Sequence, residues 1–198
     1  MTRGTRAVAL LVCGSLVEDV RALVRAREWD ADVYGVSPLH HLRPEGIVDA
    51  VTERLEQVDG AYEKVVVVYG DCGTAGRLDA VLHRYGAARP AGPHCYEMLA
   101  GESFGEITEA RPGTFFLTPW LIRNFDRYVV RRLGLDEHPE LVSSYFRHFT
   151  DVVYLRQSPD LALDRKAHEI AAFLGLRLEL RDTDLKELEG RLAELVEA

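Results

Sequence analysis

The stretch KVVVVYGDCGTAG, residues 64–76, decides the fold of this chain. Its first half holds four consecutive valines, and such a run of β-branched residues is typical of a strand buried on both faces of a sheet. Its second half, GDCGTAG, has the glycines of a tight turn, and a helix is expected from Arg77 to Tyr85. The stretch therefore predicts a strand–turn–helix unit in a parallel sheet.

Strands and helices are predicted to alternate on both sides of this unit. The expected strands are 7–12, 32–36, 64–69, a brief one near 87–89, 114–118, 152–155 and 177–180. The expected helices are 15–28 with Ser15 as its cap, 45–58, 77–85, a turn at 95–99, 120–133, 139–149, 162–174 and 185–197. This alternation predicts an α/β fold, a mostly parallel sheet sandwiched by helices in Rossmann-like layers. We expect a single domain over residues 1–198, with a helical excursion around 123–149.

Composition excludes several classes of protein. The chain has 198 residues, of which 47% are hydrophobic and 28% charged, as in an ordinary globular protein. A net charge of −8 argues against a nucleic acid or an anionic membrane as partner, and no segment has the roughly 18 apolar residues of a membrane span. The three cysteines favour free or metal-bound thiols in a reducing compartment, so we expect a cytoplasmic protein.

All three cysteines lie at turns. Cys13 ends the first expected strand, Cys72 follows the valine strand, and Cys95 follows the proline-rich segment RPAGPH. Because the carboxyl ends of parallel strands meet at one edge, where open α/β sheets bind ligands, these thiols are expected to converge. Three thiolates at one place would form a soft metal site. The spacing adds no support, since the chain contains no CxxC or HExxH motif.

Histidines follow two of the same strands and are candidate metal ligands. His40 lies in the loop after the second strand, and its neighbour His41 is the weaker candidate of this pair. His94 directly precedes Cys95, where it could act as a fourth ligand or as a proton donor. The competing interpretation is that each histidine has only a structural role.

The turn after the valine strand is a second candidate site. Gly70, Asp71, Gly73 and Thr74 are predicted to bind a cofactor, because backbone N–H groups at the start of a helix can hold an anion. The turn matches neither GxGxxG nor the Walker A pattern. An equally good interpretation is that its glycines only turn the chain.

Five motifs in order, LVCGSL, SPLHHLRPEG, YGDCGTAG, GPHCYEMLAG and PGTFFLTPW, resemble those of an uncharacterised family, domain of unknown function 1638. The resemblance covers roughly residues 8–155. It implies an α/β protein whose three cysteines share a site with histidines at the positions of His40 and His94, and a link to corrinoid-dependent methyl or one-carbon metabolism. The chain departs from the family pattern where His94 and Cys95 are adjacent, and at the proline before Trp120.

Several kinds of chemistry fit these residues. An iron–sulfur cluster with an open iron position is slightly favoured, because structural zinc usually takes close-spaced ligand pairs. The alternatives are a zinc–thiolate enzyme or structural zinc protein, and a non-enzymatic metallochaperone or partner of a corrinoid protein. A metal-free enzyme would use Cys72 as nucleophile and His94 as base on a small-molecule substrate.

Overall fold

The computed structural model describes residues 6–198 and shows two compact units, each built on a three-stranded parallel sheet. Unit 1 consists of the chain up to Met98 together with Lys186–Ala198, and unit 2 of Leu99–Leu185. The α/β class and the parallel pairing are therefore confirmed. The strands divide between two sheets, which the alternation of elements did not reveal. That residues 1–198 form one domain stays a prediction.

The sheet of unit 1 has its first strand at the centre. β1 (Arg6–Cys13) lies between β2 (Ala31–Val36) and β3 (Tyr62–Val68), and both pairings are parallel. Val12 pairs with Val68, so β1 and β3 end at the same level. The carboxyl ends of the two strands thus lie side by side.

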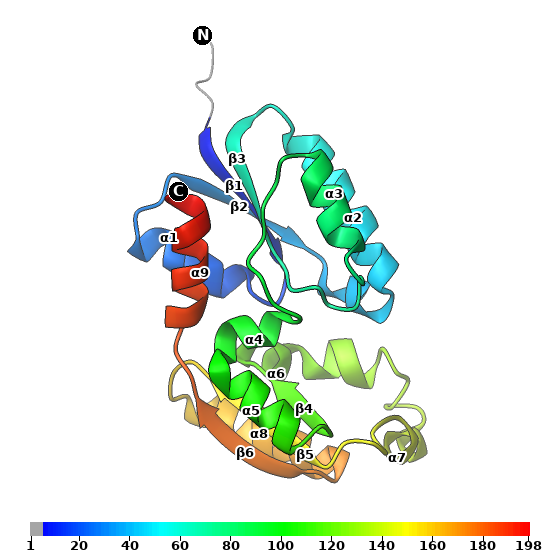
Figure 1. Cartoon of the computed structure of the whole chain (residues 1–198). Coiled ribbons are helices and arrows are strands. Elements are labelled where there is room, and N and C mark those ends of the chain that lie inside the picture. Colours follow the sequence, from blue (N-terminus) through cyan, green and yellow to red (C-terminus); the bar gives the residue numbers. More distant parts are fainter. Residues whose placement is uncertain (1–5) are drawn as a thin grey trace. The chain divides into compact units, whose positions relative to one another are not determined.

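Helices cover both faces of this sheet. α1 (Val17–Ala26) and α9 (Lys186–Val196) lie on one face, and α2 (Pro44–Val58) and α3 (Arg77–Arg84) on the other (Figure 1). The connection from β1 to β2 therefore runs over one face, and the connection from β2 back to β3 runs over the opposite face. The direction of the connections reverses at β1, the kind of point where open α/β sheets form a ligand crevice.

Unit 2 repeats the parallel arrangement without such a reversal among its strands. β5 (Asp151–Arg156) lies between β4 (Thr114–Leu117) and β6 (Arg177–Asp182), in chain order. On one face, Leu117 belongs to a core that α8 (Leu161–Leu174) shares. α5 (Glu102–Ala110) covers the other face, where the ring of its Phe104 stacks on Phe116 of β4 with centroids 5.2 Å apart.

The excursion expected around 123–149 is helical and belongs to the core of unit 2. It begins in α6 (Pro119–Phe125) and continues through one π-helical turn (Asp126–Val130), one 3-10 turn (Pro139–Leu141) and α7 (Val142–Tyr145). Its buried core side chains are Phe125, Val129, Leu135 and Phe146. The segment is therefore a packed part of the unit.

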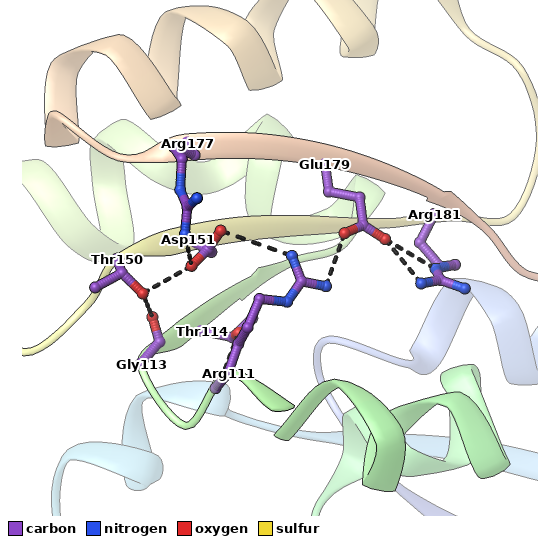
Figure 2. A network of polar contacts seen from close by, with 8 residues as sticks. All are labelled: Arg111, Gly113, Thr114, Thr150, Asp151, Arg177, Glu179 and Arg181. Carbon is purple, nitrogen blue, oxygen red and sulfur yellow. Dashed lines mark hydrogen bonds and ion pairs between the residues drawn. The ribbon is translucent and has the colours of Figure 1, made fainter. Parts of the chain in front are cut away.

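A network of charges joins the amino-terminal ends of β5 and β6 (Figure 2). Asp151 is only 4% exposed; its carboxylate accepts hydrogen bonds from Thr150 Oγ1 at 2.7 Å and from Arg177 at 3.1 Å. Arg111 lies 3.6 Å from the same carboxylate and 2.7 Å from Glu179. The Thr150 hydroxyl and the two arginines hold the pKa of Asp151 below its usual value.

The helices expected at 120–133 and 139–149 are divided into the shorter elements described above, and two other elements also differ from the sequence expectations. The brief strand expected at 87–89 is a single parallel bridge between Ala88 and β3, and α5 was not foreseen. Across residues 6–198, every helix is too short or too polar to span a bilayer.

Candidate metal centre at the carboxyl edge of unit 1

The structure brings the three cysteines together at the carboxyl ends of β1 and β3. Cys13 is the last residue of β1, Cys72 lies in the turn after β3, and Cys95 begins α4 (Cys95–Ala100). The Sγ atoms of Cys72 and Cys95 are 3.6 Å apart, and Cys13 and Cys95 belong to a group whose ligand atoms lie within 4.8 Å of one another. All three are free thiols, 8% exposed at Cys72 and at most 1% at the others.

A glycine at the end of β3 lets the segment that carries Cys95 approach. A Cβ on Gly70 would lie 2.6–2.7 Å from three backbone atoms of His94, closer than any real contact. Two backbone hydrogen bonds hold this approach, from Asp71 N to Gly92 O at 3.0 Å and from Cys72 N to Pro93 O at 2.9 Å. The segment before Cys95 is therefore held against the turn that carries Cys72.

His41 completes the group with Cys13 and Cys95. It lies in a 3-10 helix, η1 (Pro38–Leu42), which approaches β1 closely because a Cβ on Gly14 would stand 2.7 Å from Pro38 Cδ. The Nδ1 of His41 donates a hydrogen bond to the Pro38 carbonyl at 3.0 Å, and its ring stacks on Tyr69 with centroids 6.0 Å apart. Nε2 is therefore the ring nitrogen left for the thiols, the orientation usual for a metal-binding histidine.

The two histidines named from the sequence take other positions. His40 packs toward α2, where a Cβ on Gly46 would be 3.1 Å from its Nδ1, and among residues 6–198 it is not part of the Cys13–His41–Cys95 group. The His94 ring is 6.4 Å from that of His41, and its Nδ1 accepts the backbone N–H of Tyr96 at 3.2 Å. Burial lowers the pKa of His94 and so favours the neutral ring. Their roles as ligands stay predictions.

The three thiols differ in pKa. Hydrogen bonds with Cys95, together with the charge of His41 and against the effect of burial, lower the pKa of Cys72 to about 4 and that of Cys13 to about 6. The same hydrogen bonds, together with burial, raise the pKa of Cys95 well above its usual value. The lowered pKa of Cys13 and Cys72 favours the thiolate, the form of cysteine that binds metal.

The pKa of His41 is shifted in the opposite direction to those of Cys13 and Cys72. Burial opposes protonation of its ring, but the hydrogen bond with Cys72 and the attraction of both thiolates outweigh burial and raise its pKa to about 9. Ser15 adds a further contact, with its Oγ 3.1 Å from Cys13 Sγ. The expectation that Ser15 caps the following helix is wrong, because α1 begins at Val17 with Leu16 in the cap position.

The turn that was expected to bind an anion already binds the carboxylate of its own Asp71. The Asp71 carboxylate accepts hydrogen bonds from Thr74 Oγ1 at 2.9 Å, Ala75 N at 3.2 Å and Gly76 N at 3.0 Å. These contacts, led by the Gly76 N–H, lower the pKa of Asp71. A phosphate here would have to displace a bound carboxylate, so the contacts weigh against cofactor binding at Gly70, Asp71, Gly73 and Thr74, which stays a prediction.

The same turn holds Cys72 in an unusual backbone conformation. Cys72 has φ of 47° and Ala75 has φ of 53°, both in the left-handed region that costs a residue with a Cβ on the order of 1–2 kcal/mol. Gly73 and Gly76 occupy the same region at 82° and 77°, which glycine tolerates. Cys72, the least buried of the three cysteines, therefore has a strained backbone conformation.

Two aromatic residues at the site were missed from the sequence. Tyr69 is fully buried beside the ring of His41, and Tyr96 packs against His94 with ring centroids 4.5 Å apart. Burial and the nearby thiolates raise the pKa of both hydroxyls. The signal was present, because each tyrosine lies within three residues of a candidate ligand in the motifs YGDC and HCY.

Comparison with known proteins identifies the chain at the level of a family. A family model described as a protein of unknown function, DUF1638, matches residues 36–192, which include His41, Cys72 and Cys95 but not Cys13. Neither the curated proteins nor the solved structures contain a match. The match covers most of the chain, which therefore belongs to the DUF1638 family.

Proposed function

We propose that this protein binds one zinc ion through Cys13, Cys72, Cys95 and His41. The observation that carries the proposal is the distance of 3.6 Å between the Sγ atoms of Cys72 and Cys95. Zinc binds thiolates at about 2.3 Å in a tetrahedron, which puts two thiolates of one ion about 3.8 Å apart. The two thiols therefore stand close to the separation that a single zinc ion requires.

The remaining donors support the same ion. Cys13, Cys95 and His41 have ligand atoms within 4.8 Å of one another, and three sulfurs with one imidazole nitrogen are a common zinc ligand set. The hydrogen bond from His41 Nδ1 to the Pro38 carbonyl fixes the ring with Nε2 toward the thiols. Because Cys95 and His41 must each lose a proton to bind the ion, affinity should fall as the pH falls.

An iron–sulfur cluster fits the distances less well. In a cubane cluster each cysteine binds a different iron, so its thiolates stand farther apart than two thiolates on one ion. Cys72 and Cys95 would have to separate from their present 3.6 Å contact to make room. The cluster is therefore the alternative outcome of the test below.

The proposed centre would tie together the segments that meet at this edge. Its ligands come from the end of β1, the 3-10 helix η1, the turn after β3 and the start of α4. Four protein ligands fill a tetrahedral zinc ion, the arrangement of structural centres, and loss of His41 from the ion would open one position for a substrate. A catalytic role stays an alternative suggested by the residues, and a corrinoid-protein partner stays a prediction that draws on the family resemblance.

The metal content of protein purified without oxygen tests the proposal. We expect about one zinc per chain, no acid-labile sulfide and no colour. In competition with a chromophoric chelator, His41→Ala should weaken zinc binding at least about tenfold, whereas the adjacent His40→Ala should leave it unchanged. Brown protein with iron and sulfide would support the cluster, and protein that binds no metal under these conditions would exclude both centres.

A further inference from the structure

Cys72 and Cys95 are placed to react with each other as well as to share an ion. Their sulfurs are in contact at 3.6 Å, and two hydrogen bonds hold the backbones of the turn and of the segment before Cys95 together, at 3.0 Å and 2.9 Å. A disulfide requires the sulfurs to approach to about 2.05 Å, a closure of about 1.5 Å from their present contact. The two sulfurs are therefore already in contact, on segments whose backbones are hydrogen-bonded to each other.

We propose that Cys72 and Cys95 form a reversible disulfide when a peroxide reaches the metal-free protein, so that the centre exists either with metal bound or oxidised. The disulfide itself rests only on the contact between the two sulfurs. The exclusion of metal by oxidation rests also on the proposed zinc function, because the disulfide removes two of the four ligands.

Exposure assigns the roles of the two sulfurs. Cys72 is 8% exposed, whereas Cys95 is 1% exposed and Cys13 is fully buried. Because Cys72 is the least buried of the three residues, we expect its thiol to meet a small oxidant first and the Cys95 thiol to react from inside. Cys13 is held in the central strand by the pairing of its backbone with Val36, and we expect it to remain a thiol.

The reaction balances with peroxide as the oxidant. The Cys72 thiolate attacks one peroxide oxygen, the O–O bond breaks, Cys72 becomes a sulfenic acid, and the departing hydroxide takes up a proton to become water. The Cys95 sulfur then attacks the Cys72 sulfur, the S–O bond breaks as the S–S bond forms, and the second hydroxide leaves as water with the Cys95 proton. Two thiols are oxidised, and one peroxide is reduced to two waters.

The full chain, treated with chelator and then with stoichiometric hydrogen peroxide, tests the disulfide. We expect free thiols to fall from three to one per chain, with the bond mapped to the peptides of Cys72 and Cys95 and reversed by dithiothreitol. Cys13→Ser should still lose two thiols. In Cys95→Ser the sulfenic acid of Cys72 should persist and react with dimedone. A disulfide that involves Cys13, or no disulfide in the wild-type chain, would overturn the inference.

Zinc loading separates this inference from the proposed function. If zinc binds and slows the loss of thiols, both stand. If zinc binds but peroxide leaves Cys72 and Cys95 unlinked in the metal-free protein, the disulfide is excluded and the zinc centre stands. If peroxide links the two cysteines in a protein that binds no zinc, the disulfide stands, and the zinc function and the exclusion of metal both fail.

Discussion

The carboxyl edges of the two sheets differ although both sheets are three-stranded and parallel. In unit 1 this edge gathers three thiols and an imidazole between the ends of β1 and β3. In unit 2 the corresponding edge is closed by charge pairs, with Arg156 at 2.8 Å from Asp164 and 2.5 Å from Asp182. One edge therefore collects reactive side chains, and the other ties its strands and helix together.

Topology explains this difference. In unit 1 the segment after β1 leads to α1 on one face of the sheet and the segment after β3 leads to α3 on the other, so these two segments diverge. In unit 2 the strands follow chain order, so adjacent connections run the same way. In unit 1 the three cysteines and His41 gather where the strand order reverses.

The largest effect should come from placing a Cβ at the close approach in unit 1. In Gly70→Ala the new carbon would meet three backbone atoms of His94 at 2.6–2.7 Å, none of which can rotate away. We expect a loss of about 3 kcal/mol in the free energy of unfolding and a zinc affinity reduced at least about tenfold, since the segment that positions Cys95 must move. Urea unfolding and chelator competition measure the two effects.

A matched clash in unit 2 serves as the control. In Gly113→Ala the new carbon would stand 2.6 Å from the carbonyl oxygen of His148, at the amino-terminal end of the other sheet. This variant should also lose about 2 kcal/mol of stability, but it should bind zinc like the wild type. Equal loss of zinc in both variants would mean that metal binding reports only global stability, which would contradict a local site.

The site could be located from the sequence more easily than its ligands could be chosen. Cysteines at the ends of two predicted strands were enough to place Cys13 and Cys72 at one edge, because parallel strands share their carboxyl ends. The preference for His40 over His41 had no packing information behind it, and successive residues of a 3-10 helix point about 120° apart. Which histidine faces the cysteines depends on how the 3-10 helix packs, and that packing includes a tertiary contact between Pro38 and Gly14.

Two other features were also beyond the sequence. The turn GDCGTAG has the composition of an anion-binding loop, but its N–H groups bind the Asp71 carboxylate because Cys72 and Ala75 adopt left-handed conformations that their residue types do not favour. The division into two sheets depends on which strands pair, and alternation is the same for one sheet of six strands as for two of three.

Acid should act on unit 2 through its buried carboxylate. The folded-state pKa of Asp151 lies below its ordinary value of about 3.9, so its contribution to stability is complete above that pH and is lost as the pH falls through the folded pKa. We expect Asp151→Asn to lose about 2 kcal/mol at pH 7, a difference that shrinks below about pH 4, with zinc binding at pH 7 unchanged. Urea unfolding of both proteins across this pH range measures the difference in their free energies of unfolding. If that difference does not change with pH, the charge of Asp151 does not contribute to stability.

The smallest effect concerns the strain at Cys72. Glycine adopts a φ of 47° without a Cβ penalty, whereas serine keeps the penalty, so Cys72→Gly should be about 0.5–1 kcal/mol more stable than Cys72→Ser in the metal-free state. Both variants should lose zinc equally, because both lack the thiolate. Ala75→Gly, at φ of 53° in the same turn, should gain a similar amount and keep its zinc. If neither glycine raises the free energy of unfolding, the turn carries no strain, and the position of Cys72 needs no stabilisation from the rest of unit 1.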